Sequence, residues 1–243
     1  APSIVVAAFA LVVTTLSCAA FKSGSDNGSG GGGGGSADGG VDRGNVPATS
    51  CTATKERSFM PLGEATKDSY WAGIAPAGDQ MGVVWEAPGA SASTLYFARI
   101  DNLGKPSGTK NLGAGQDPVL RRDGADLALF YRDGDTVYVR HLDDSGSFTT
   151  PATKVYGPTN GFFSLAWLGD GYAMGLDGAE SLPYEVHLLR TDASGAPLDA
   201  PQRVPTMGNN SVQPAIAFDG ATATISLAWT DMREGTPAVY FAT

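Results

Sequence analysis

Apolar and polar positions after about residue 70 follow a pattern of short strands that recurs at a nearly constant spacing. Short runs rich in valine, leucine and aromatic side chains are separated by glycine, aspartate and serine, which predicts strands joined by tight turns. One residue marks the same place in each of four successive copies: Trp85, Tyr131, Leu176 and Trp229. These residues are 46, 45 and 53 positions apart, so the sequence predicts an internal repeat.

Each copy contains more than one predicted strand. The strand that carries the aligned residue lies at Gly82–Glu86, Leu127–Asp133, Tyr172–Asp177 and Leu227–Asp231. A first strand precedes it at Gly73–Gly78, Val119–Gly124, Ser164–Gly169 and Ala215–Gly220. A third strand follows it at Leu95–Asp101, Val137–Asp143, Val186–Asp192 and Val239–Thr243. A fourth strand is predicted near Lys110–Leu112, Lys154–Tyr156 and Gln202–Val204.

Four short strands in a repeat of this length are typical of a β-propeller blade. We therefore predict an all-β fold, a β-propeller of about four four-stranded blades over residues 51–243. A β-sandwich and an open array of sheets are the alternatives. The fourth copy stops at Thr243 after its third strand, and we expect Arg57–Leu62 to supply the missing outer strand and cover the edge. In the rival interpretation the chain is truncated and the full ring has more blades.

The N-terminus predicts export. Ile4–Leu16 contains 13 residues without a charge. A segment that spans a bilayer needs about 20 apolar residues, so this one fits the apolar part of a signal peptide, which we place at residues 1–17.

Residues 18–50 form a glycine- and serine-rich linker with six consecutive glycines, Gly30–Gly35. Because glycine loses much backbone entropy on ordering, we expect a disordered tether with a reach of roughly 30 Å.

The residues at the end of the apolar stretch, Leu16-Ser17-Cys18-Ala19, resemble the lipobox of bacterial lipoproteins. The resemblance implies cleavage before Cys18 and acylation, for example with palmitate, that anchors the chain in a membrane. Thr15 departs from the pattern, which usually has leucine there, and no Lys or Arg precedes the apolar stretch. Ala19 implies the outer membrane or cell surface as the destination. Secretion, a periplasmic location and an uncleaved anchor are the alternatives.

Composition limits the classes of binding partner and of site that the chain can have. The net charge is −9 and the pI about 4.6, which disfavours nucleic acid because phosphate binding requires Lys and Arg. The two cysteines, Cys18 and Cys51, are too few for a disulfide scaffold, and no Cys/His cluster predicts a metal site. We therefore predict no cofactor and no metal. Cys51 has no intrachain partner if Cys18 is lipidated.

The C-terminal pattern W-x-D-x-R-x-G, followed by YFA, resembles propeller-type repeats of bacterial surface lipoproteins, which are distantly akin to the sialidase-like repeat group. The resemblance covers about Tyr70 to Thr243 and implies a propeller fold without implying an activity. A sialidase Asp-box has one residue between its aspartate and glycine, whereas Asp231 and Gly235 are separated by three. The arginine triad of sialidases cannot be placed either.

The candidates for catalysis are few. The histidines His141 and His187 fall at repeat positions and are interpreted as structural, and no serine lies in a G-x-S-x-G motif. Asp133, Asp177 and Asp231 recur after the second strand, and paired carboxylates can hydrolyse glycosidic bonds. Their recurrence favours capping of turns, because aspartate accepts hydrogen bonds from nearby backbone N–H groups.

Two arginines break the repeat. Arg121 and Arg122 replace Ala217 and Phe218 of the last copy, on the strand that lines the axis of a propeller. They are candidates for binding an anionic ligand, together with Trp167 on the equivalent strand of the third copy. The alternative is that Asp123 and Asp126 neutralise both arginines.

The sequence favours a lipid-anchored, extracytoplasmic propeller that binds a protein or a glycan without catalysis. The first alternative is a carbohydrate-active enzyme, a glycosidase or lyase, that uses aspartates at the mouth of the propeller. The second is a structural protein of the cell envelope. The expected partners are a membrane, through the lipid anchor at Cys18, and a protein or glycan ligand.

Overall fold

Every regular element in the described part of the chain is a β-strand. The computed structural model describes residue 62 and residues 69–124, 126–159, 161–178, 184–204 and 211–243, within one unit that runs from Phe59 to Thr243. The predicted signal peptide, Cys18, the linker and Cys51 lie outside the described residues. No helix among the residues described is long and apolar enough to cross a membrane.

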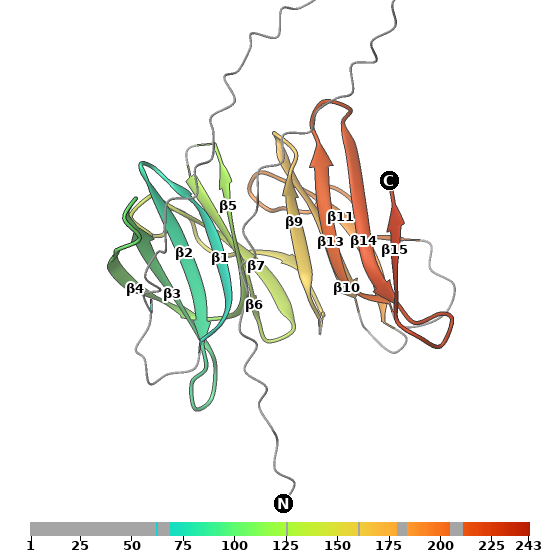
Figure 1. Ribbon diagram of the computed structural model, residues 1–243, viewed down its shortest axis with the longest axis horizontal. Helices are drawn as coiled ribbons and strands as arrows, with labels where there is room; N and C mark the ends of the chain where they lie inside the picture. The colour runs from blue at the N-terminus through green and yellow to red at the C-terminus, as the bar shows by residue number, and fades with distance from the viewer. Residues whose placement is uncertain (1–61, 63–68, 125, 160, 179–183, 205–210) are drawn as a thin grey trace, which may run out of the picture. The chain divides into compact units, whose positions relative to one another are not determined.

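The strands form four antiparallel sheets, each ordered as the chain runs (Figure 1). The first sheet contains β1 (Tyr70–Ala77), β2 (Gln80–Ala87), β3 (Thr94–Ile100) and β4 (Pro106–Ala114). The second contains β5 (Gln116–Asp123), β6 (Asp126–Asp133), β7 (Thr136–Leu142) and β8 (Thr153–Tyr156). The third contains β9 (Phe163–Trp167), β10 (Gly171–Gly178), β11 (Glu185–Asp192) and β12 (Gln202–Arg203). The last contains β13 (Ser211–Asp219), β14 (Thr224–Asp231) and β15 (Ala238–Ala242).

The strand register confirms the predicted repeat. The four aligned residues of the second strands face equivalent residues of the third strands, in the pairs Trp85–Tyr96, Tyr131–Tyr138, Leu176–His187 and Trp229–Tyr240. Three of these pairs are stacked aromatic rings with centroids 5.8, 6.0 and 6.2 Å apart. Cross-strand aromatic pairs stabilise a sheet, so the repeat preserves one packing contact through the copies.

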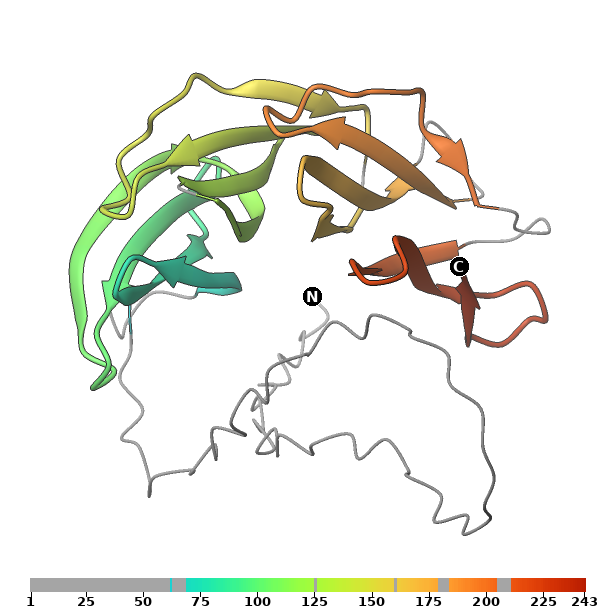
Figure 2. The same cartoon turned by 90° about the horizontal axis from the view of Figure 1, so that it is seen from above.

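The four sheets follow one another along an arc in Figure 2. The first strands lie next to each other, because β1 contacts β5 and β13 contacts β9. Three apolar layers fill the spaces between successive sheets, with Phe97 and Leu120 in the first layer, Phe130 and Met174 in the second, and Leu227 in the third. This is the blade packing of a β-propeller, so the predicted all-β fold of repeated sheets is confirmed.

The predicted closure of the last blade stays a prediction. The described part of the last sheet has three strands, and residues 57–61 lie outside the described residues. Leu62, the last residue of the predicted closing strand, packs against Val83, Trp85 and Ala98 of the first sheet.

Two turns pack a glycine closely against a buried side chain of the preceding sheet. Gly146, in the turn after β7, has φ +79°, and a Cβ there would lie 2.2 Å from Cδ1 of the buried Phe97 ring in the first sheet. Gly195, in the turn after β11, repeats the arrangement one sheet later, with a Cβ position 2.2 Å from Cγ1 of Val139. Gly104, in the equivalent turn after β3, also has a positive φ, +83°, but no atom lies within 4 Å of its Cβ position.

We expect Gly146→Ala to destabilise the protein more than Gly104→Ala. Both substitutions force alanine into a left-handed backbone conformation, at a cost of about 1–2 kcal/mol. Only Gly146→Ala also overpacks a core, which adds about 1–3 kcal/mol. Chemical denaturation of the two variants measures the difference in unfolding free energy. Equal losses of unfolding free energy would show that the close contact of Gly146 with Phe97 does not stabilise the packing of the first two sheets.

Candidate functional site

At one end, three of the four sheets carry irregular backbone at equivalent positions. Trp71, Asp117 and Gln213 have φ values of 46°, 50° and 57°, and each lies at a register shift where a first strand pairs with a second strand. Phe162 directly precedes β9 at the same end of the third sheet, where β9 pairs with β10 without a register shift. We call these four the mouth residues. Bulges re-aim side chains, and a positive φ at a residue other than glycine costs about 1–3 kcal/mol, which is typical of functional positions.

Buried carboxyl groups hold two of these bulges in place. Glu86 is the last residue but one of β2 in the first sheet, and its Oε2 accepts a hydrogen bond of 2.9 Å from the backbone N–H of Asp117 in the next sheet. Asp177 occupies the same position in the third sheet, and its Oδ2 accepts the N–H of Gln213 at 3.5 Å. An acid in one sheet thus positions the mouth residue of the next sheet.

Arg132 occupies the equivalent position in the second sheet, but it binds the side chain and not the backbone of a mouth residue. Its Nε and Nη2 lie 2.9 and 2.8 Å from Oδ2 of Asp117, and its Nη1 donates to the carbonyl oxygen of Gly134 at 3.1 Å. Asp117 is therefore fixed by Glu86 through its backbone and by Arg132 through its side chain.

Two mouth residues from separate sheets form an exposed aromatic pair. The rings of Trp71 and Phe162 have centroids 5.2 Å apart and are tilted by 55°. Trp71 is 54% exposed and Phe162 37% exposed, and the neighbouring Tyr70 is 50% exposed. A contiguous group of exposed aromatic side chains typically marks a binding surface.

A pocket of about 260 Å³ adjoins this pair, between the third and last sheets. The residues that line it are Gly161, Phe162, Asp177, Tyr184, Val212 and Gln213. We call it the acidic pocket. Asp177 is only 3% exposed, and its Oδ1 is buried without a hydrogen-bond partner among the described residues. Burial raises the pKa of Asp177, although hydrogen bonds from the backbone of Phe162 and Gln213 oppose the shift.

Gly161 makes the placement of that carboxyl group possible. A Cβ at residue 161 would lie 1.7 Å from Oδ1 of Asp177, so no larger residue fits there without moving the carboxyl group. A buried acid with an unsatisfied oxygen costs stability, which is typical of a group retained for binding or chemistry.

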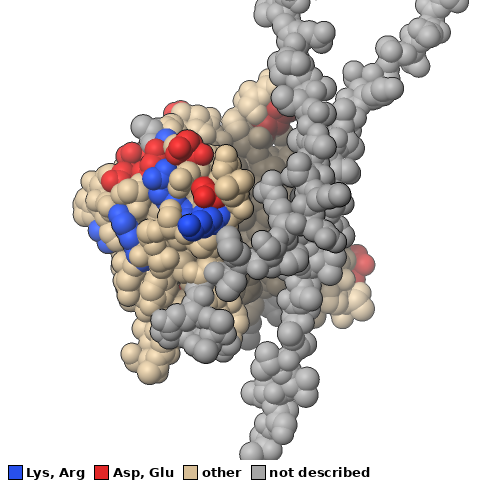
Figure 3. Space-filling view, turned by 60° about the vertical axis from the view of Figure 1, so that its left-hand side comes forward, with Lys and Arg blue, Asp and Glu red and all other residues tan. Residues whose placement is uncertain are grey.

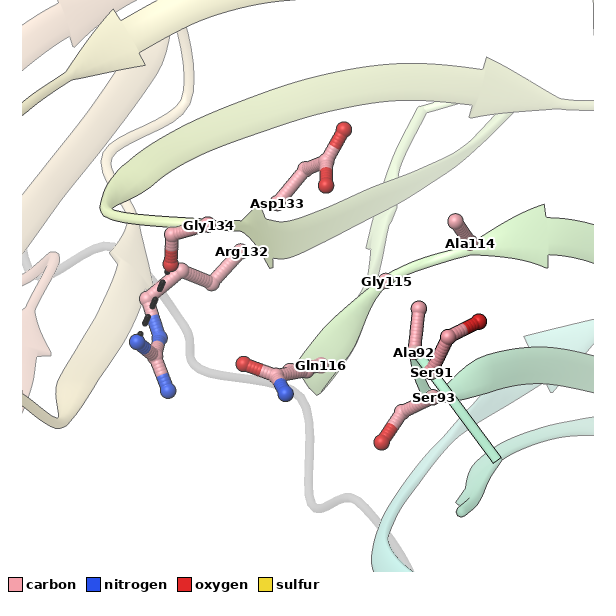
Figure 4. Close-up of a pocket in the computed structure, with 9 residues that line it drawn as sticks. All are labelled: Ser91, Ala92, Ser93, Ala114, Gly115, Gln116, Arg132, Asp133 and Gly134. Atoms are coloured by element: carbon pink, nitrogen blue, oxygen red, sulfur yellow. Dashed lines mark hydrogen bonds between the residues drawn. The ribbon is translucent and has the colours of Figure 1, made fainter. Parts of the chain in front are cut away.

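A second pocket, of about 270 Å³, lies between the first and second sheets (Figure 4). The residues that line it are Ser91, Ala92, Ser93, Ala114, Gly115, Gln116, Arg132, Asp133 and Gly134. We call it the polar pocket. Figure 4 shows Gln116 between Arg132 on one side and Ser93 on the other.

The three residues singled out from the sequence lie away from the mouth residues. Arg121 and Arg122 are near the end of β5, and Trp167 is the last residue of β9. Arg121 donates to the carbonyl oxygens of Leu120 at 3.2 Å and Leu165 at 3.4 Å, and burial lowers its pKa. Trp167 packs on Tyr172, with ring centroids 4.8 Å apart.

The alternative interpretation, that Asp123 and Asp126 neutralise both arginines, is wrong. Arg122 pairs with Asp144, from the turn after β7. Oδ2 of Asp123 instead accepts the hydroxyl of Tyr172 and lies 3.0 Å from Nε2 of His141. Asp123 is directed towards the third sheet, where a buried tyrosine requires an acceptor, and so it does not reach the arginines.

The interpretation of three equivalent aspartates as turn caps is also wrong in part. Asp231 does cap a turn, because its Oδ1 accepts the N–H of Arg233 at 2.8 Å, and the side chain of Arg233 lowers its pKa. Asp177 lies one position earlier in the repeat than Asp133 and Asp231. The offset of Asp177 is visible in the sequence, because Asp177 directly follows the aligned residue Leu176, whereas Asp133 and Asp231 each lie two positions after theirs.

Other kinds of site are not apparent in the described residues. No group of three or more His, Cys, Asp or Glu side chains is placed there to hold a metal ion. The repeat pattern did not identify Trp71 and Phe162, because both precede the predicted first strands, Gly73–Gly78 and Ser164–Gly169.

Comparisons with known proteins give similarity of structure only. No protein-family model and no curated protein matches the chain. A subtype N11 neuraminidase-like protein of a flat-faced bat H18N11 isolate is 15% identical, with a TM-score of 0.49 over 71% of this chain and 51% of that one. The chain thus spans about half of that protein.

Two bacterial enzymes show similar values. The endo-arabinase of Bacteroides thetaiotaomicron is 12% identical, with a TM-score of 0.45 over 70% of this chain and 72% of that one. A GH43_1 enzyme of Xanthomonas citri is 13% identical, with a TM-score of 0.43 over 70% and 67%.

The raised pKa of Asp177 predicts a pH dependence of stability. A buried acid whose folded pKa exceeds its unfolded value of about 3.9 binds more protons when folded, so its contribution to stability falls as the pH rises between the two values. We expect the unfolding free energy of the wild type, relative to Asp177→Asn, to decrease from pH 4 to pH 7. Urea denaturation at several pH values tests this, and a constant or increasing difference would contradict it.

Proposed function

We propose that the chain is an exported binding module whose ligand is a glycan held at the mouth residues. The observation that carries the proposal is the exposed Trp71–Phe162 pair beside a pocket that contains a buried carboxyl group. A sugar ring has apolar C–H faces and a rim of hydroxyl groups. It therefore suits a surface that combines flat aromatic rings with hydrogen-bonding groups in a recess.

The conformations of the mouth residues support binding by a rigid site. Glu86 and Asp177 hold the bulges at Asp117 and Gln213 from neighbouring sheets, and the aromatic side chains have few rotatable bonds. A site of this kind loses little conformational entropy when a ligand binds, which favours affinity. Protein ligands usually require a larger apolar core than one aromatic pair with a pocket of 260 Å³ provides.

The acidic pocket favours binding over glycoside hydrolysis. Hydrolysis by the common mechanism requires two carboxyl groups about 5–10 Å apart on either side of the bond. Asp177 is the one carboxyl group among the described residues that line the pocket. A single carboxyl group cannot act as both the acid and the base or nucleophile that this mechanism requires.

Export and lipid anchoring are part of the proposal. The apolar segment Ile4–Leu16, the lipobox-like sequence around Cys18 and the glycine-rich linker would place the binding domain outside the cytoplasm, tethered to a membrane. The acidic composition fits a soluble domain near anionic lipid, because like charges keep it off the lipid surface.

We expect Cys18→Ala to release the protein from the membrane fraction, because acyl chains contribute about 0.8 kcal/mol of membrane affinity for each buried CH₂ group. Cys51→Ala is the matched control and should remain membrane-bound. Cell fractionation and the mass of the mature N-terminus provide the measurements. A Cys18→Ala variant that stays in the membrane, or an unmodified Cys18, would contradict the anchor.

We expect Trp71→Ala and Phe162→Ala each to weaken glycan binding by about 5- to 150-fold, the range for truncation of an aromatic anchor worth about 1–3 kcal/mol. A glycan array identifies the ligand for the wild type, and calorimetry compares the variants. Leu103→Ala is the control, because Leu103 is 84% exposed in the turn after β3. The proposal would be contradicted if the wild type bound no glycan on the array, or if it bound only a protein ligand. Unchanged glycan affinity in both aromatic variants would also contradict it.

A further inference from the structure

We infer that the polar pocket is a second sugar subsite, so that the ligand is an uncharged oligosaccharide and not a single sugar. The inference rests on the proposed function and extends it to a part of the surface that the aromatic pair does not reach. It depends on three observations: the connection between the polar pocket and the mouth residues, the chemical groups that line the pocket, and their charge.

A continuous series of contacts joins the polar pocket to the aromatic pair. Tyr70, beside Trp71, pairs with Glu86 in the first sheet. Glu86 accepts the backbone N–H of Asp117, and Asp117 binds the guanidinium group of Arg132, which lines the pocket. The polar pocket and the mouth residues are therefore parts of one end of the sheets, where second strands finish and first strands begin.

The lining of the polar pocket matches the rim of a sugar. The lining residues Ser91, Ser93 and Gln116 carry hydroxyl and amide groups that both donate and accept, and Asp133 carries a carboxylate that Figure 4 shows directed away from Gln116. Gln116 lies between Ser93 and Arg132, so donors and acceptors follow one another along the pocket (Figure 4). Alanine and glycine residues make up the rest of the lining and leave room for a ring.

The charge of the pocket favours an uncharged ligand. Both Nε and Nη2 of Arg132 are within 2.9 Å of the same oxygen of Asp117, so the guanidinium charge is already compensated. Asp133 adds a further negative charge to the lining. An anionic ligand would have to compete with Asp117 and approach Asp133, whereas a hydroxyl group can use the remaining N–H donors at no such cost.

The surface around the first two sheets does not attract a charged polymer either. Figure 3 shows basic and acidic side chains side by side near one end of this face, with uncharged residues over most of the rest. Two of the ion pairs formed in these sheets are Arg99–Asp79 and Arg122–Asp144. A surface of mixed sign has no extended field to steer a polyanion.

The volumes of the two pockets indicate an extended ligand. The acidic pocket measures about 260 Å³ and the polar pocket about 270 Å³, both below the usual range for a site that encloses a whole drug-sized ligand. Each suits one small ring. Two such pockets at one end of the sheets, with an exposed aromatic pair beside the first, suit a chain of sugars.

Calorimetry with a length series tests the inference on the full chain. The probes are glucose, mannose and xylose with their neutral β-linked and α-linked oligomers of two to six units, and a sulfated heparin hexasaccharide as the charged probe. The variants are Gln116→Ala and Ser93→Ala, which alter the polar pocket, Trp71→Ala at the aromatic pair, and Leu103→Ala as the control.

We expect at least one neutral series in which the longest oligomer binds about 10-fold or more tightly than its monosaccharide. Gln116→Ala and Ser93→Ala should each reduce that gain by about 3-fold or more, and a cooperative urea unfolding transition like that of the wild type shows that both variants are folded. Trp71→Ala should weaken oligomer and monosaccharide alike, and the heparin hexasaccharide should bind more weakly than the neutral hexamer.

Several outcomes would overturn the inference. Affinity independent of length, or an unchanged length gain in both polar-pocket variants, would remove the second subsite. Tighter binding of the heparin hexasaccharide would show that the pocket selects an anion. In each of these cases a loss of monosaccharide binding in Trp71→Ala would leave the proposed function standing. If no sugar binds at all, the proposed function and the inference both fail.

Discussion

The burial of one sheet face against the next is the constraint on which this structure depends. A four-stranded sheet of this size cannot bury its own apolar side chains, so each repeat is stable only when a neighbour covers it. The layers around Phe97, Phe130 and Leu227 meet this need three times. Glycine turns such as Gly146 extend the contact, because they bring the backbone of one sheet against a buried ring of the previous one.

The same stacking creates the candidate site. Buried acids at the ends of second strands reach across to the next sheet, where Glu86 and Asp177 satisfy the backbone N–H groups of two bulges. The bulges have unfavourable φ values that a free strand would relax, so the neighbouring sheet has to maintain them. Trp71 and Phe162 meet for the same reason, since their positions are set by the packing of whole sheets.

The sequence predicted the repeat and the strand register well, because each copy preserves the same local pattern. The pairs formed by Trp85 and Trp229 with Tyr96 and Tyr240 follow directly from that alignment. The site was much less predictable. Trp71 and Phe162 are far apart in the chain and lie just outside the aligned strands, so no local pattern relates them. Arg121 and Arg122 were conspicuous because they break the repeat, yet they use backbone carbonyls and Asp144 as partners.

Fluorescence of Trp71 tests the central claim, that a glycan covers the mouth residues, most directly. Trp71 is 54% exposed, whereas Trp85 and Trp229 are 5% and 4% exposed and Trp167 is partly buried, so Trp71 contributes most to quenching of tryptophan emission by acrylamide. A saturating glycan that packs on the Trp71–Phe162 pair should reduce this quenching in the wild type and have no such effect in Trp71→Phe, which keeps an aromatic ring there. Quenching that is unchanged by a bound glycan in the wild type would contradict the claim, because the ligand would then lie elsewhere.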